Sequence, residues 1–566
     1  MISQTRPTAD RTQAASSPPA HWLLAPRATT MLAVLSLVVL TCVTFWPTLN
    51  NGFVNWDDPA NYLSNGHLGF SADDVTWAWT TFHLGAYEPL AWMVSSGEYV
   101  VWQFDPRWYH AVSIGLHAAT AVAVYFLTVE ILRLCRAGSA FETAAAAAAS
   151  TAWFAVHPQR VEVVAWITAQ PNLLCALFCL WSILAYLHAV EPSGSLNRRW
   201  LNVSLALFVA SLLSKAPAVS LPVVLLVLDV YPLRRITSQT EPGQTILALV
   251  WEKAWFFVFS AVFSVLAFLA KAQTFHGVLL PYSGFASRVI AAGYSTWFYL
   301  SKLVVPSEFL PYYRLPGLVT LSNAAYLVPV LLIFAISLLL LFARKWLPNL
   351  LATWVVFLVI LAPVSGFVSM STQLVADRHA YLASMAWCPL LAYGLTTRRV
   401  LRARWTSVLA ATTCLLAIAW LATSTRKLVP TWHDSETLWR HALDYKSGRT
   451  MMAYNNLASA YLENGDVNDA VSLYRSALTD DINPTDLNGR VLVLFNFADV
   501  LVRLGRSEEA IEQYQKMAEI APVGADTHYR WGVALSQAGR RTEATVHFNQ
   551  ALKLDPGRAG ANSALQ

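Results

Sequence analysis

The stretch from Ala324 to Ala343, AAYLVPVLLIFAISLLLLFA, carries no charged side chain and is followed at once by Arg344 and Lys345. A helix of about 20 apolar residues spans the roughly 30 Å hydrocarbon core of a bilayer, so this stretch predicts a transmembrane helix. Ten further apolar runs predict helices of the same kind. The complete set of predicted spans is 31–46, 108–134, 144–156, 173–190, 200–213, 217–230, 251–270, 324–343, 350–367, 381–395 and 405–423.

The composition of the chain agrees with a membrane location. Hydrophobic residues make up 56% of the 566 positions and charged residues 13%, whereas about 25% charged is usual in a soluble domain. These values exclude a disordered, collagen-like or disulfide-rich chain. The net charge of +5 is modest, and we interpret the basic run 398–404 as a juxtamembrane anchor rather than a nucleic-acid site.

Charged residues around the apolar runs predict the orientation of the bundle. Most basic clusters flank the runs and are assigned to the cytoplasm by the positive-inside rule. The segment 47–107 contains seven carboxylates and one basic residue, so it is predicted as the first outside loop. The interrupted run 289–305 is ambiguous, and the basic clusters alternate consistently only if it enters and leaves on one side. We therefore expect about eleven spans within 29–424, after a disordered cytoplasmic tail at 1–28.

The C-terminal part repeats with a period of 34 residues. Three copies are predicted, at 451–484, 491–524 and 525–558. A small residue recurs in the first half of each copy and an aromatic residue in the second half, namely Ala458 with Tyr474, Ala498 with Tyr514 and Gly532 with Phe548. This is the tetratricopeptide (TPR) pattern, in which two antiparallel helices approach closely and stack on the next pair.

The predicted fold class is therefore all-α: a multi-pass transmembrane domain followed by a soluble TPR α-solenoid. A linker at 425–450 is expected to join it to the solenoid, 451–566. Because the C-terminus is predicted outside, the solenoid is expected to share a compartment with the first outside loop.

Two adjacent carboxylates, Asp57 and Asp58, follow an apolar stem in the first outside loop. Adjacent side chains of an extended segment point in opposite directions, so one carboxylate can face a reaction site while the other holds the loop or a cation. Ordinary turn chemistry is the alternative, since Asp-Asp-Pro also favours turns.

Further polar residues lie at the outer ends of other apolar runs. Each alone is compatible with a loop ion pair or a snorkelling cation, but together they suggest an outward-facing site for a lipid-linked phosphate. The candidate substrate-binding residues are His157, Arg160, Glu162, Lys215, Asp377, Arg378 and His379.

Six phrases occur in a fixed order along the chain: FVNWDD at 53–58, WYHA at 108–111, HPQRVEVVAW at 157–166, LSK at 213–215, ADRHAYL at 376–382 and WHDSETLW at 432–439. Together with the repeats they resemble the transmembrane and TPR repeat-containing family of protein O-mannosyltransferases. Three places depart from the family's pattern. Glu88 replaces a basic residue in a Tyr-x-Pro-Leu phrase, and Gln170-Pro171-Asn172 replaces a basic pair followed by Asp after the Ala-Trp-Ile phrase. Ala216 replaces an acid after Lys215.

The resemblance implies a glycosyltransferase of the GT-C class, which passes a sugar, here mannose, from a polyprenyl-phosphate donor to Ser or Thr of an extracytoplasmic protein. It implies that Asp57 and Asp58 are catalytic, with Asp57 as the base. Arg160, Lys215 and Arg378 are the candidates for stabilising the leaving phosphate.

The expected partners are the lipid-linked sugar, an acceptor protein held by the TPR array, and the bilayer, with no nucleic acid. No metal ligands are assigned and a divalent metal requirement stays open. The expected location is an inner membrane with periplasmic repeats in a bacterium, or the endoplasmic reticulum membrane in a eukaryote. The alternative function is a non-catalytic membrane scaffold that presents TPR repeats for assembling secreted or envelope proteins.

Overall fold

The computed structural model describes residues 27–191, 195–236, 242–274, 284–367, 373–397, 404–479, 486–557 and 560. Within these ranges the regular secondary structure is helical, apart from one isolated bridge between Val190 and Leu196. Turns and loops connect the helices. The predicted all-α class is confirmed. Residues 1–26 of the predicted tail lie outside the described part.

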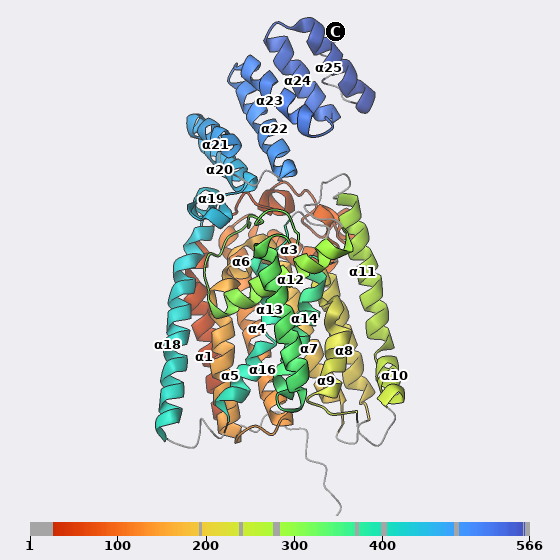
Figure 1. Cartoon of the computed structure of the whole chain (residues 1–566), viewed down its shortest axis with the longest axis vertical. Helices are drawn as coiled ribbons and strands as arrows, with labels where there is room; N and C mark the ends of the chain where they lie inside the picture. The colour runs from red at the N-terminus through yellow and green to blue at the C-terminus, as the bar shows by residue number, and fades with distance from the viewer. Residues whose placement is uncertain are drawn as a thin grey trace, which may run out of the picture.

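Long helices stand side by side and form the bundle, with the C-terminal repeats above one end (Figure 1). Every predicted apolar run falls on one or two of them. They are α1 (Arg27–Phe45), α4 (Pro106–Leu134), α5 (Ala140–Ala155), α7 (Gln170–Ala189), α8 (Arg198–Ser214), α9 (Leu221–Val230), α10 (Pro242–Glu252), α11 (Ala254–Thr274), α13 (Ala324–Phe342), α14 (Pro348–Leu361), α15 (Ala380–Ser384), α16 (Trp387–Leu395) and α18 (Arg404–Leu428).

Six helical stretches of the described part are long and apolar enough to cross a membrane, and two shorter apolar helices accompany them. Helix α7 is the central element, because most of its residues are buried between its neighbours α4 and α8. Rim helices instead expose apolar side chains, such as Leu415 and Leu416 on α18. Such a surface suits lipid rather than water. The total of eleven spans stays a prediction.

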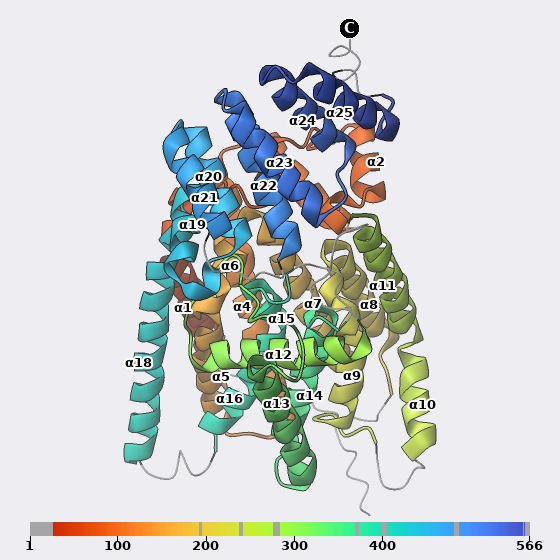
Figure 2. The ribbon, with the colours of Figure 1, turned by 45° about the horizontal axis from the view of Figure 1, so that its top comes forward.

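Helix α12 (Phe285–Val304) contains most of the ambiguous run 289–305 and lies across the long helices (Figure 2). One of its faces is buried and includes Tyr299 and Lys302, while Phe285 and Val289 are exposed. Gly293 allows the close approach to α13, since a Cβ there would lie 2.8 Å from Val330.

The first outside loop folds at the end of the bundle that faces the repeats. It contains two α-helices, α2 (Ala72–Thr80) and α3 (Pro89–Trp102), and short turns at Trp46–Asn50, Pro59–Leu63 and His83–Gly85. The α2 start is fixed by a capping box between Ser71 and Asp74. Backbone bonding ties the loop to the chain after α18, because Gly52 N–H donates to His433 O at 2.8 Å.

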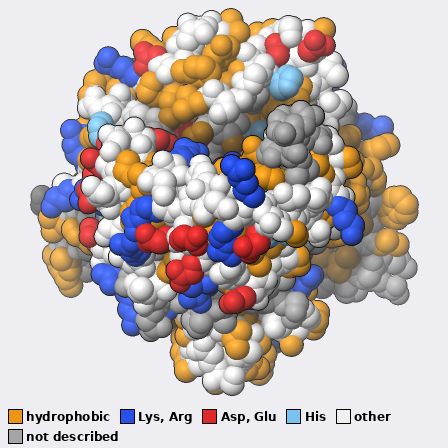
Figure 3. Space-filling view, turned by 90° about the horizontal axis from the view of Figure 1, so that it is seen from above, with side chains coloured by type: hydrophobic (Ala, Val, Ile, Leu, Met, Phe, Trp, Pro, Cys, Tyr) orange, Lys and Arg blue, Asp and Glu red, His pale blue; other side chains and the backbone are white. Residues whose placement is uncertain are grey.

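The repeats form antiparallel helix pairs: α20 (Met451–Asn464) with α21 (Val467–Thr479), α22 (Leu487–Arg503) with α23 (Ser507–Ile520), and α24 (Ala525–Gln537) with α25 (Arg541–Leu554). Gly532 shows why the small residue recurs, since a Cβ there would lie 2.6 Å from the Phe548 ring. The predicted linker 425–450 is itself folded and contains helix α19 (Ser435–Asp444), which packs on α20. Acidic and basic side chains lie next to one another on the face seen from above the repeats (Figure 3).

Candidate active site

A cavity of about 710 Å³ lies between the first outside loop and the membrane helices. Part of its wall is polar and includes Asp57, Lys215 and Arg378, from three distant parts of the chain. Another part of the wall is apolar and comes from α9, α11, α14 and the turn after α14. Its residues include Val223, Phe263, Leu266, Phe268, Val359, Val364 and Phe367. The cavity therefore combines charged groups with a surface suited to a hydrocarbon chain.

Asp57 is partly buried in the cavity wall. Within the described residues, no hydrogen bond or ion pair engages its carboxylate. Burial raises the pKa of Asp57, and the nearby cations Arg378 and Lys215 oppose that rise. A raised pKa makes the carboxylate a stronger proton acceptor than an exposed aspartate.

Asp58 is completely buried and holds the loop in place. Its carboxylate accepts a bond from Val54 N–H at 2.9 Å, and from the hydroxyl and N–H of Thr168 at 2.6 and 3.2 Å. Burial outweighs these bonds and raises the pKa of Asp58 to about 6. Asp57 thus lines the cavity, whereas Asp58 is buried outside its wall. The pair lies in a turn with helical backbone at Asp58 (φ −61°, ψ −40°), not in the extended segment expected from sequence.

Replacing Asp58 by Ala should lower the stability of the first outside loop. Three buried or partly buried donors would lose their acceptor, at a cost of about 1–3 kcal/mol for each group left unsatisfied. We expect a lower melting temperature and faster proteolysis between Trp46 and Pro106. Matched Asp73→Ala, at an exposed position of α2, should leave both unchanged; equal behaviour of the two variants would contradict the anchoring role.

Among the described residues, three cations line the cavity: Lys215 after α8, Lys271 at the end of α11, and Arg378 between α14 and α15. The Lys215 ammonium lies 3.2 Å from Glu88, another cavity residue. Arg378 is held by Glu162, which lies outside the cavity wall and accepts from its backbone N–H at 2.6 Å. Its Nη2 also donates to Gln373 at 2.8 Å, and Gln373 lines the cavity. His379 also lines the cavity, and its Nδ1 lies 3.2 Å from the Tyr299 hydroxyl.

The other predicted site residues lie behind the cavity wall. Glu162 is buried and fixes Arg378. Asp377 is buried too, where Tyr313 donates to it and the Lys302 ammonium lies 3.9 Å away. These two carboxylates therefore act on the site through neighbouring residues.

His157 and Arg160 are also fully buried and absent from the cavity wall. His157 Nε2 donates to Leu303 O at 3.3 Å. The Arg160 guanidinium stacks on Phe154 and Tyr381, with ring centres at 4.8 and 5.6 Å. The structure therefore places Lys271, rather than Arg160, beside Lys215 and Arg378.

Sequence reasoning did not identify Lys271 and His83 as site residues. It also did not predict that Glu88 lines the cavity beside Lys215. Lys271 ends a long apolar run, where a lysine usually snorkels to the interface. Its position near Asp57 depends on how α11 packs against the first outside loop, which no local pattern encodes. Within the described residues, no group of three or more His, Cys, Asp or Glu side chains is arranged to hold a metal ion.

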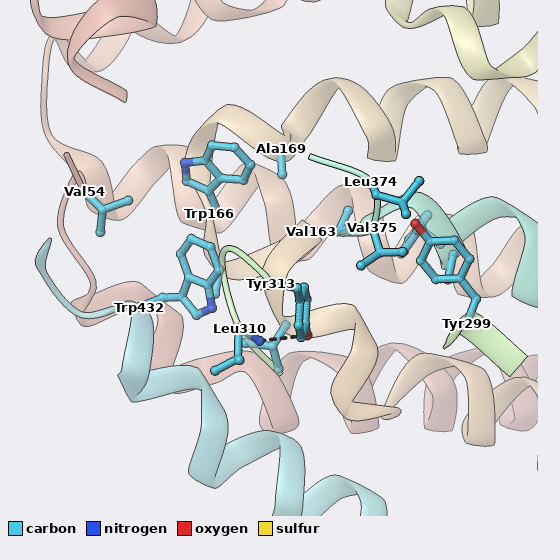
Figure 4. Packing of buried hydrophobic residues seen from close by; sticks show 14 of the residues in the cluster. Val54, Val163, Trp166, Ala169, Tyr299, Leu310, Tyr313, Leu374, Val375 and Trp432 are labelled. Atoms are coloured by element: carbon cyan, nitrogen blue, oxygen red, sulfur yellow. Dashed lines mark hydrogen bonds between the residues drawn. The ribbon is translucent and has the colours of Figure 1, made fainter. Parts of the chain in front are cut away.

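Aromatic residues connect the cavity to the repeat end. Trp166 lines the cavity and stacks on Trp432 at a ring distance of 5.9 Å (Figure 4). Asn55, two positions before Asp57, accepts a bond from Trp439 Nε1 at 2.7 Å and donates to Asn456 O at 2.8 Å. The loop that carries Asp57 is thus fastened to both α19 and the first repeat.

These features define a class: a helical membrane protein with a charged, partly apolar cavity and a TPR domain docked above it. Models of the tetratricopeptide repeat match residues 449–523 and 525–558, which confirms the repeats.

Similar proteins carry the name protein O-mannosyl-transferase. Tmtc3 of Drosophila melanogaster is 24% identical over 508 residues, covering 79% of this chain and 53% of that protein. Tmtc1 of the same organism is 31% identical over 199 residues, covering 32% and 21%. Human TMTC3 is 28% identical over 183 residues, covering 31% and 18%. These matches confirm the resemblance to the transmembrane and TPR repeat-containing family, and the chain spans about half or less of the relatives' lengths.

Proposed function

We propose that this protein is a membrane glycosyltransferase of the GT-C type, which moves mannose from a polyprenyl-phosphate donor to Ser or Thr of an extracytoplasmic protein. The names of the similar proteins, protein O-mannosyl-transferases, support the reaction type. The observation that carries the proposal is the position of Asp57, an unpaired carboxylate in a cavity that also presents three cations and an apolar wall.

The cavity suits an amphipathic donor. Lys215, Lys271 and Arg378 offer positive charge for the phosphate, and charge-assisted bonds of this kind are strong in a partly buried site. The apolar residues of α11 and α14 offer a surface for the adjoining lipid chain. Because rim helix α11 is exposed along most of its length, the lipid chain of the donor has a short path from this wall to the bilayer.

The transfer is a single displacement. The acceptor hydroxyl attacks the anomeric carbon while the Asp57 carboxylate takes its proton. The bond between that carbon and the phosphate oxygen breaks, and the polyprenyl phosphate leaves with an additional negative charge. Lys215, Lys271 and Arg378 stabilise this charge, and the sugar inverts its anomeric configuration.

The TPR domain holds the acceptor in this proposal. Helical repeats of this type bind extended segments along their concave surface. The contacts of Asn55 fix the first repeat next to the loop that carries Asp57. A bound acceptor would therefore have a high effective concentration near the base. The proposed compartment is the periplasmic side of an inner membrane or the luminal side of the endoplasmic reticulum membrane.

A direct transfer assay tests the proposal. The purified protein would be supplied with radiolabelled polyprenyl-phosphate mannose and a Ser/Thr-rich acceptor, and label on the acceptor would be measured. We expect protein-bound mannose with the anomeric configuration opposite to that of the donor. Its release by the mannosidase specific for that opposite configuration, and not by the other mannosidase, would show the inversion. Absence of transfer with mannose and other sugar donors would instead favour the scaffold.

The proposed base predicts a pH dependence. Burial raises the pKa of Asp57, and only its carboxylate form accepts a proton, so kcat/KM should fall as pH drops through that raised pKa. Lys215→Met removes a cation that lowers the pKa of Asp57, so the acid limb should move to higher pH. Exposed Lys427→Met should not move it. A limb unaffected by Lys215→Met would argue against Asp57 as the titrating group.

A further inference from the structure

Glu88 occupies an unusual position for an acidic residue in a phosphate site. It lines the same cavity as Lys215, Lys271 and Arg378, and its Oε1 lies 3.2 Å from the Lys215 ammonium. Among the described residues that line the cavity, Glu88 and Asp57 are the carboxylates. Asp57 acts on the cavity cations at a longer range, whereas Glu88 makes a direct ion pair with Lys215 inside the cavity.

The pair differs from the other ion pair at the cavity. Arg378 is bound by Glu162, whose side chain is only 4% exposed and lies outside the cavity wall. That carboxylate fixes Arg378 from behind and leaves its outer edge facing the cavity. Glu88 instead covers Lys215 from the cavity side, where a donor phosphate would have to sit.

The segment that carries Glu88 contains a strained turn. All six residues from His83 to Glu88 line the cavity. Leu84 has a positive φ of 46°, which costs a non-glycine residue energy, and Gly85 follows with φ of 75°. Glu88 stands at the N-terminus of α3, yet its side chain makes no capping bond. Within the described residues, the ion pair with Lys215 is therefore the contact that holds the Glu88 carboxylate.

We propose that Glu88 is an internal substitute for the donor phosphate, which it replaces on Lys215 whenever the site is empty. This inference rests on the proposed function. When the donor binds, its phosphodiester takes Lys215 and the Glu88 side chain moves away. Transfer turns the phosphodiester into a monoester with about 1.5 to 2 negative charges, which binds the cations more tightly, and the returning Glu88 carboxylate competes with it and promotes release.

The proposal separates binding from turnover. Glu88→Gln keeps the size of the side chain but removes the competing charge, so anions should bind more tightly and leave more slowly. We expect about a five- to tenfold lower Kd for a polyprenyl monophosphate, with a lower KM for the donor and a lower kcat. Glu88→Asp keeps the charge and should stay close to the wild type in Kd.

Binding can be measured without acceptor or sugar. The full-length protein in nanodiscs would be titrated with undecaprenyl phosphate, and the change in intrinsic tryptophan fluorescence, to which Trp92 and Trp166 in the cavity wall contribute, would be measured. Asp73→Asn is the matched control, because it removes one negative charge from an exposed position of the same loop; its Kd should stay within about twofold of the wild type. Melting temperatures would confirm that all variants are folded.

The outcomes distinguish the two proposals. If the wild type binds no polyprenyl phosphate at all, the proposed function fails. If it binds but Glu88→Gln binds equally or more weakly, only the substitute role is overturned, and Glu88 then orients Lys215. Equal tightening by Asp73→Asn would also overturn it, because the effect would be one of overall charge. Tighter binding in Glu88→Gln but not in Asp73→Asn, with a lower kcat in Glu88→Gln, supports the inference.

Discussion

Replacing Asp57 by Asn is expected to lower mannose transfer at least about a hundredfold, since general-base catalysis contributes about 10²–10⁴ to a rate. Asparagine has nearly the same shape but cannot take the hydroxyl proton. Within the described residues the Asp57 carboxylate makes no hydrogen bond or ion pair, so replacing it by an amide breaks no structural contact. We therefore expect the loss in kcat, with the melting temperature unchanged. The measurement is single-turnover transfer at saturating donor.

Two controls make this result specific. Asp58→Asn should lower stability as well as activity, because the amide cannot accept all the bonds that the buried carboxylate receives. Binding of undecaprenyl phosphate to the Asp57→Asn variant should be at least as tight as in the wild type, since a negative charge leaves the cavity. Full transfer by Asp57→Asn would refute the base assignment, and unchanged stability in Asp58→Asn would refute the division of roles.

The helices could be predicted from sequence because each depends on a local pattern. Runs such as 324–343 are apolar on every face, and only lipid or a buried position accommodates them. The TPR helices follow from pairs such as Gly532 and Phe548, whose close contact the structure shows. Such signals need no knowledge of tertiary packing.

The site was predictable only where the family's phrases contain cavity residues. Asp57, Lys215, Arg378 and His379 do line one cavity. Arg160 belongs to such a phrase too, yet its side chain turns into the protein and stacks on aromatic rings. A shared sequence motif identifies a group of candidate residues. Whether each side chain faces the cavity depends on how α5, α12 and α15 pack around that motif.

The role of Glu88 illustrates the same limit. In the sequence it is a departure from a pattern, and Ala216 is another, unrelated one. The structure brings Glu88 to Lys215, directly before Ala216, so a carboxylate from the first outside loop pairs with this lysine. Only the folded chain shows that the two departures lie next to each other.

Replacing Trp439 by Ala is expected to have the largest effect on stability. The side chain is completely buried, donates to Asn55 at 2.7 Å and packs edge-on against Trp56 at a ring distance of 5.4 Å. Truncating a buried tryptophan costs about 3–5 kcal/mol. Because Asn55 and Trp56 directly precede Asp57, we also expect transfer to fall strongly, although no catalytic group is removed.

Variants of graded size separate packing from hydrogen bonding at the contact of Trp439 with Asn55 and Trp56, which we call the joint. Trp439→Phe keeps most of the ring contact and loses one bond, worth about 1 kcal/mol, so its melting temperature and transfer rate should lie between those of wild type and Trp439→Ala. Trp346→Ala removes a tryptophan that is 80% exposed and should change neither. If Trp439→Ala lowers the melting temperature but leaves transfer intact, Asp57 is positioned without help from α19. The repeats would then bind acceptors independently of the loop, because the joint would be structural only.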